Sequence, residues 1–185
     1  MELDIYQVDA FTEKVFGGNP AAVCPLETWI DASLMQHIAE ENNLAETVFF
    51  VKKDNQYEIR WFMPHAEIDL CGHATLAAAF VIFQYIDPSI DIIRFSSQSG
   101  PLQAKKLADG NIVLDFPSRP PSAVEIPEAI FKAFNHRPIA AAASRDLILL
   151  FESEKEIQTL TYDLSGLKEL PYLGIVPTAK GTTAD

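Results

Sequence analysis

The sequence predicts an α+β fold in which a sheet wraps around one central helix. Two observations lead to this prediction: most segments alternate between apolar and polar residues as strands do, and one segment, residues 72–86, is almost purely apolar. No charge occurs between Ala74 and Phe83. A helix that is apolar on every side must be buried on every side, and a bilayer span needs about twenty such residues. A sheet curved around this helix is therefore the expected architecture.

The first part of the chain predicts a strand at residues 2–11, a turn at residues 17–20 and a second short strand. The hydrophobic period then changes to that of a helix. Asp31 can cap this helix, and Asn42 or Asn43 can end it in the left-handed conformation. Its expected apolar face consists of Leu34, Met35, Ile38 and Ala39.

A hairpin is expected next, with strands at residues 46–53 and 57–63 and a turn at Asp54 and Asn55. After the apolar helix, the alternation predicts further strands at residues 92–97, 102–107 and 111–116. Together with the first strands, these segments supply the sheet that the central helix requires.

Residues 117–127 contain four prolines and are therefore expected to form a linker. This linker separates a first unit, residues 1–116, from a second unit, residues 128–185. In the second unit we expect two helices, the later one opened by a capping box of Ser153 and Glu156, and two apolar strands. With about sixty residues, this unit is near the size at which a single core is marginal, so we expect it to be incomplete.

Composition narrows the function classes. The net charge of -12 repels a phosphate backbone, so nucleic acid is not an expected partner. The first residues carry acids where a signal peptide carries Lys or Arg, and a cytoplasmic location without membrane contact is expected. Cys24 and Cys71 are too few for a disulfide framework and lack the spacing of a structural zinc site.

The stretch "LCGHAT" opens the apolar helix and places Gly72 and His73 in its first turn. Backbone N–H groups there have no intrahelical partner, and glycine lets a ligand approach, which is typical of a carboxylate or phosphate site. The alternative is structural: Gly72 allows tight packing while Asp69 caps the helix.

The side chains of this stretch also leave two interpretations open. His73 can orient a ligand or move a proton, or it can be a hydrogen-bonded histidine at a helix start. Cys71 can have a lowered thiol pKa and act as acid, base or nucleophile, or it can be a small buried residue. His65, Cys71 and His73 do not follow a standard zinc pattern, so no metal is expected.

Glu46 lies in "LAETVFF", where a helix gives way to a strand. A carboxylate between apolar neighbours can be partly desolvated, which raises its pKa toward the range of a general base. The alternative is a solvated glutamate at an ordinary junction.

Five segments in order, "DAFTEKVFGGNPAAV", "NNLAETVFF", "RWFMPHAEIDLCGHAT", "SSQSGPL" and "LDFP", resemble the PhzF-like family of phenazine biosynthesis, relatives of diaminopimelate epimerase. The resemblance covers nearly the whole chain. It implies two similar lobes, each a curved sheet around a central helix, with the active site in the cleft between them. It also implies an isomerase that moves a proton within a small carboxylate-bearing metabolite without any cofactor.

The resemblance assigns roles residue by residue. Glu46 corresponds to the acid/base residue, His73 joins it as a catalytic group, and Gly72 and His73 lie at the substrate. Asn19, in the "GNP" turn, lies near it, and Cys71 is expected to contribute to substrate binding.

Family members continue beyond the position of Asp185, and their second lobe completes the cleft. Two functions therefore stay open at this point: a PhzF-like isomerase, or a truncated non-catalytic remnant that binds a small acid or a protein partner. We expect the apolar strands of the second unit to favour association, with a homodimer as the expected form.

Overall fold

The computed structural model describes residues 2–14 and 16–182, and the chain divides into two compact units, Met1–Pro117 (unit 1) and Ser118–Asp185 (unit 2). Among these residues, unit 1 contains an eight-stranded sheet with the order β1-β2-β3-β4-β6-β7-β8, and β5 pairs with β4. The β2–β3 and β4–β6 pairs are parallel, and the other pairs are antiparallel. The strands are β1 Tyr6–Ala10, β2 Asn19–Leu26, β3 Glu46–Lys53, β4 Gln56–Met63, β5 Ala66–Ile68, β6 Ile92–Ser97, β7 Gly100–Lys106 and β8 Ile112–Asp115.

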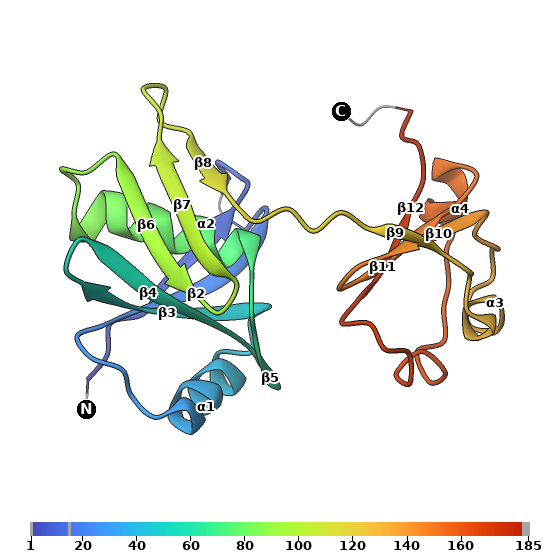
Figure 1. The fold of residues 1–185 in the computed structure, drawn as a ribbon, viewed down its shortest axis with the longest axis horizontal. Coiled ribbons are helices and arrows are strands. Elements are labelled where there is room, and N and C mark those ends of the chain that lie inside the picture. The colour runs from blue at the N-terminus through green and yellow to red at the C-terminus, as the bar shows by residue number, and fades with distance from the viewer. Residues whose placement is uncertain (1, 15, 183–185) are drawn as a thin grey trace. The chain divides into compact units, whose positions relative to one another are not determined.

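Two helices cover opposite faces of this sheet. Helix α2 (Gly72–Val81) lies inside the curve of the strands and contacts β1, β2, β3 and β8, whereas α1 (Ala32–Asn42) packs on the outer side against β3 and β4 (Figure 1). Because α2 contacts strands from both ends of the strand order, the sheet must curl. The expected α+β architecture with a central buried helix is thus confirmed.

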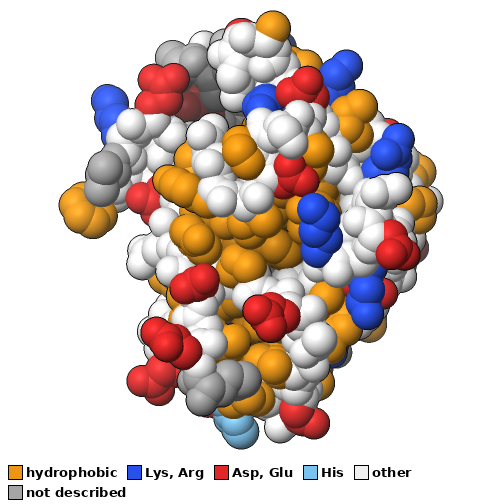
Figure 2. Space-filling model, turned by 90° about the vertical axis from the view of Figure 1, so that its left-hand side faces the viewer, with side chains coloured by type: hydrophobic (Ala, Val, Ile, Leu, Met, Phe, Trp, Pro, Cys, Tyr) orange, Lys and Arg blue, Asp and Glu red, His pale blue; other side chains and the backbone are white. Residues whose placement is uncertain are grey.

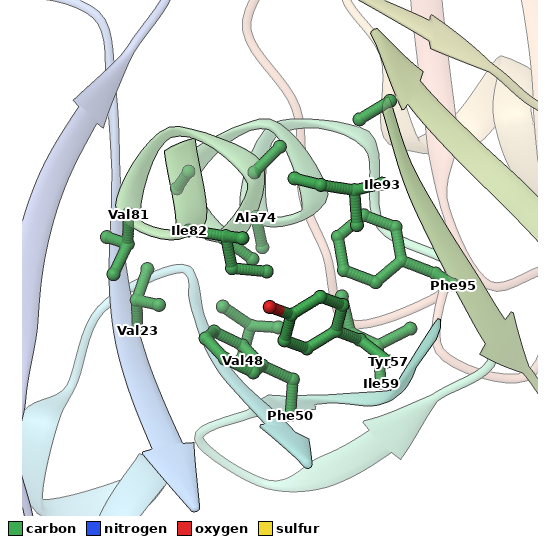
Figure 3. Packing of buried hydrophobic residues seen from close by; sticks show 14 of the residues in the cluster. Val23, Val48, Phe50, Tyr57, Ile59, Ala74, Val81, Ile82, Ile93 and Phe95 are labelled. Atoms are coloured by element: carbon green, nitrogen blue, oxygen red, sulfur yellow. The ribbon is translucent and has the colours of Figure 1, made fainter. Parts of the chain in front are cut away.

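Alternation along the strands sends successive side chains to the two helices. On β3, Val48 and Phe50 belong to the cluster around α2, and Phe49 and Val51 belong to the cluster under α1. The unbroken apolar run of this strand therefore reflects burial on both faces rather than on one. Figure 3 shows the inner cluster, in which the following side chains are labelled: Val23, Val48, Phe50, Tyr57, Ile59, Ala74, Val81, Ile82, Ile93 and Phe95.

The apolar helix is as long as predicted, but its last turns differ from the expectation. After Val81 the chain continues as a π-helix, η1 (Ile82–Ile86). Phe80 is 37% exposed and Tyr85 is 62% exposed, so the helix is not covered on every side. These two rings contact one another edge to face, and Tyr85 stacks on Tyr6 of β1. Aromatic packing at the surface thus replaces burial at the end of the helix.

The ends of α1 follow the sequence signals. The Asp31 carboxylate accepts a hydrogen bond from the Ser33 N–H, and Asn43 ends the helix with a left-handed φ of 49°. Met35 and Ala39 are buried as predicted, but Leu34 is 37% exposed. Leu34 was therefore wrongly assigned to the buried face.

The hairpin of β3 and β4 has the predicted turn, because Lys53 pairs with Gln56 across two residues and Asp54 has a φ of 52°. Three short strands were not predicted: β5, β9 (Ser122–Val124) and β10 (Ala140–Ala143). The last two lie in unit 2, and β9 falls inside the range expected to be a linker. A three-residue edge strand can form between prolines because it needs few backbone N–H groups.

Unit 2 contains a four-stranded sheet with the order β12-β11-β10-β9. Strands β11 (Leu147–Leu150) and β12 (Ile175–Thr178) are parallel, and β12 accommodates a proline because it lies at the edge. Helices α3 (Glu128–Ala133) and α4 (Glu154–Gln158) are short. At α4, the Ser153 hydroxyl accepts from the Glu156 N–H, as the capping box predicts.

The core of unit 2 is small and consists of buried residues from α3, β10, β11 and the loops: Ile130, Phe134, Ala141, Leu147, Leu149, Phe151 and Leu167. Within the described part of the chain, no helix is both long and apolar enough to cross a membrane.

The molecular surface is mixed in character. Figure 2 shows one face on which hydrophobic side chains gather near the centre, with acidic and basic side chains around them.

Candidate active site

Three of the residues singled out in the sequence meet at one end of the sheet in unit 1. Glu46 is the first residue of β3, Cys71 is the N-cap of α2, and His73 lies in the first turn of that helix. Strand β3 runs parallel to β2, and α2 packs on both strands. Because β3 begins where α2 begins, the Glu46 carboxylate comes close to the helix start although 27 positions separate it from His73.

The imidazole of His73 lies between the other two groups. Its Nε2 is 3.0 Å from the Glu46 Oε2 atom, and its Nδ1 is 3.5 Å from the Cys71 sulfur. The side chains of His73 and Glu46 are only 10% and 14% exposed, and Cys71 is buried. These contacts form a nearly enclosed carboxylate–imidazole–thiol cluster, which we call the Glu46–His73–Cys71 cluster.

The atoms that join Glu46 to His73 are short of partners. Oε2 of Glu46 and Nε2 of His73 are both buried, and apart from their mutual approach neither makes a hydrogen bond within the described residues. Buried polar atoms are usually fully hydrogen-bonded in native proteins, and exceptions often mark functional groups. With the single Nε2 hydrogen of His73 directed at Oε2, the unused hydrogen-bonding capacity of the pair lies on the Glu46 carboxylate.

The cluster raises the basicity of His73. Burial by itself lowers the pKa of the imidazole, but the contacts with Cys71 and Glu46 outweigh it and raise the pKa from 6.5 to about 10. At neutral pH the ring is consequently an imidazolium, and it can donate from both nitrogens, toward the sulfur and toward the carboxylate.

The start of α2 has backbone N–H groups without intrahelical partners. The first intrahelical bond runs from Thr75 N–H to the Cys71 carbonyl, so the N–H groups of Gly72, His73 and Ala74 lie ahead of it and point out of the helix end. Cys71 makes no side-chain cap bond. The alternative in which Asp69 caps the helix is wrong, because Cys71 occupies the cap position.

Gly72 has no structural reason to be glycine. A Cβ atom at this position would meet only a ring carbon of Phe116, at an ordinary distance of 3.8 Å. Its backbone is also outside the left-handed region, which is populated by Gly18, Gly100 and Gly110. The packing explanation for Gly72 is therefore not supported, because a Cβ atom has room at this position.

The other candidate residues lie elsewhere. Asn19 begins β2, two residues before Ala21, which is the register partner of Glu46, so it is at the same end of the sheet without being a member of the cluster. His65 is exposed in the turn between β4 and β5. Cys24 is buried in the cluster under α1, on the opposite face of the sheet from Cys71, so the two thiols cannot act on one substrate as a pair.

Sequence reasoning missed one supporting residue. The Thr75 hydroxyl is fully buried and donates to the Cys71 carbonyl at 2.6 Å, which fixes the backbone from which the thiol projects. The sequence feature that could have indicated this role is that Thr75 carries the only hydroxyl between Ala74 and Phe83. The cluster also has ligand atoms within 4.8 Å of one another, a spacing that a metal ion can use. In the observed arrangement, however, both ring nitrogens of His73 already face protein groups, which favours acid–base chemistry.

A curled sheet around a central helix is an epimerase-like fold. A predicted epimerase from Pseudomonas aeruginosa shares this fold, with a TM-score of 0.72 at 19% identity over 95% of this chain and 70% of that one. The chain belongs to the PhzC-PhzF family, described as phenazine biosynthesis-like protein, which matches residues 8–185.

Closer relatives agree with this assignment. Two uncharacterized isomerases from Pseudomonas aeruginosa are each 42% identical over the whole chain, which covers 71% of their length. The crystal structure of a PhzF-family phenazine biosynthesis protein from Enterococcus faecalis is 45% identical and has a TM-score of 0.86 over all of this chain and 71% of that one. The resemblance read from the five segments is thereby confirmed.

The raised pKa of His73 predicts a measurable pH dependence. Because the folded-state pKa lies above 6.5, the stabilisation from the cluster is complete below pH 6.5 and is lost as the pH rises through about 10. An NMR titration of the His73 ring should therefore give a midpoint near 10. Glu46→Gln removes the carboxylate and should lower this midpoint. A midpoint near 6.5 in the wild-type protein would contradict the assignment.

Proposed function

We propose that this chain carries the catalytic acid–base residues of a cofactor-independent isomerase that transfers a proton within a small carboxylate-bearing metabolite. The observation that carries the proposal is the buried, otherwise unpartnered contact between Glu46 and His73 beside the open start of α2. A desolvated carboxylate next to a positive helix end suits proton abstraction from carbon, because the developing charge has a stabilising partner nearby.

Each group has a distinct role in this proposal. The Glu46 carboxylate takes a proton from a substrate carbon, the C–H electron pair moves into the adjacent unsaturated system, and the same carboxyl returns the proton to another carbon. The His73 imidazolium orients Glu46 and assists in positioning the substrate. The free N–H groups of Gly72 and His73 bind the substrate carboxylate, and Asn19 lies near it.

The absence of a side chain at Gly72 supports the anion-binding role. Packing and backbone conformation both tolerate a Cβ atom there, so the remaining reason for glycine is the approach of a ligand to the helix start. Cys71, at the N-cap, adds its sulfur to the wall of the same site.

We further propose a cytoplasmic, reducing setting and a homodimer. Both cysteines are free. Unit 2 exposes large apolar side chains at Ile139, Leu150, Tyr162, Leu164, Leu173 and Val176. Exposed large apolar side chains on a small unit favour association, and the net charge of -12 limits it to discrete oligomers.

Replacing the proposed base should separate catalysis from binding. Glu46→Gln keeps the shape of the side chain and removes its basicity, so solvent deuterium incorporation into a turned-over carboxylic acid should fall by about 10²–10⁴-fold. Substrate affinity should stay within a few-fold. Glu41→Gln, at an exposed position on α1, is the matched control and should leave exchange intact. Full exchange in Glu46→Gln would remove Glu46 from the mechanism.

Gly72→Ala should impair binding without unfolding the protein. The added Cβ has room, so stability should change by less than about 1 kcal/mol, while the methyl group blocks the approach to the helix start. Gly18→Ala is the contrasting variant, because its Cβ would lie 2.2 Å from the Ala10 carbonyl oxygen at a φ of 74°. Isothermal titration and thermal unfolding measure the two effects, and unchanged ligand affinity in Gly72→Ala would contradict the anion-site assignment.

Light scattering at low micromolar concentration tests the oligomeric state. A dimer mass is expected, because it would cover the exposed apolar side chains of unit 2. A monomer mass across the concentration range would show that these side chains stay in water.

A further inference from the structure

The cysteine of the cluster is placed as a reactive thiol. Its sulfur lies 3.5 Å from Nδ1 of His73, and Nε2 of the same ring lies 3.0 Å from Glu46. The carboxylate holds the imidazole from the far side, so one ring nitrogen remains directed at the sulfur. Carboxylate, imidazole and thiol thus form one continuous line of contacts within the described residues.

Two features of this position favour the thiolate. An adjacent imidazolium and a helix N-terminus both stabilise a negative sulfur, and Cys71 has both, because it is the N-cap of α2, a helix of ten residues. The titratable groups found against the sulfur are His73 and, within 4.8 Å, Glu46. Asp69, two residues earlier, accepts a hydrogen bond from the Ser99 hydroxyl.

We propose that Cys71 is held as a thiolate by His73 and is a site of covalent modification by small, soft electrophiles. In the resting site the S–H proton moves to Nδ1 of His73, and the Glu46 carboxylate stabilises the imidazolium. An electrophile such as iodoacetamide then forms an S–C bond while iodide leaves with its electron pair. The adduct occupies the space beside the Glu46–His73 contact, so modification closes the site of the proposed function.

The chain supplies its own comparison. Cys24 is fully buried on the other face of the sheet, and burial raises the pKa of its thiol to about 12. Cys24 is not a member of the Glu46–His73–Cys71 cluster. Cys24 should therefore remain unlabelled in the folded protein, and its protection also reports that β2 is folded in each variant.

The experiment measures the iodoacetamide labelling rate of each cysteine at pH 7 by peptide mass spectrometry on the intact chain. The deciding quantity is the ratio of the Cys71 rates in the wild-type chain and in His73→Gln, because the thiolate is the reactive form and His73 is its cationic neighbour. We expect Cys71 to be labelled in the wild-type chain and its rate to fall by about tenfold or more in His73→Gln, with Cys24 still protected.

Two results would overturn the proposal: a Cys71 labelling rate unchanged by His73→Gln with Cys24 still protected, or no labelling of Cys71 in the wild-type chain. Where His73→Gln exposes Cys24, Glu46→Gln replaces it and should lower the Cys71 rate as well. This inference rests on the site of the proposed function but needs no substrate. A Cys71 labelling rate that depends on His73, together with full deuterium exchange in Glu46→Gln, would overturn only the proposed function, and the reverse outcome would overturn only this inference.

Discussion

The burial of α2 inside the curled sheet is the constraint from which the rest of unit 1 follows. Its inward face is built of alanines and Val81, which allow the strands to approach closely on several sides. A flat sheet can cover only one side of a helix, so the strands must curve until β1 and β8 both contact it. The same curvature brings the start of β3 to the start of the helix, and this meeting point is the candidate active site.

The buried ionisable groups of the site cost free energy that the rest of the fold has to offset. Burying a carboxylate and an imidazole is unfavourable unless the two are paired, and here each is the main partner of the other. The positive end of α2 further stabilises the buried carboxylate, and the contact with Cys71 further stabilises the imidazolium. A site of this kind depends on its backbone being fixed, which the buried Thr75 hydroxyl and the adjacent parallel strands provide.

Much of the fold was predictable because local signals and burial agreed. The cap at Asp31, the turn at Asp54 and the uncharged helix each have a local cause that is visible in the residues. The short strands β9 and β10 were not predictable, because an alanine run and a proline-rich segment have no strand period. They become strands by pairing, β9 with β10 and β10 also with β11. The exposed ring of Tyr85 was missed for a related reason, since its partner Tyr6 is distant in the sequence.

The residues of the site were found by their chemical type, but their arrangement was not. Glu46 and His73 were separate candidates, each with a structural alternative, and only the parallel register of β2 and β3 with the packing of α2 shows that they are in contact. Register between distant strands is set by the whole sheet, so no local pattern reports it.

The alanines of α2 also have a mechanical consequence. Ala74, Ala77 and Ala78 are fully buried against the strands, so the distance between helix and sheet is set by methyl groups. Any larger side chain there would lift the helix away from β3 and widen the gap between imidazole and carboxylate, which are in direct contact only at this spacing. The spacing between helix and sheet therefore sets both the thickness of the core and the distance between His73 and Glu46. Substitutions in the helix are tolerated only as far as they leave this distance unchanged.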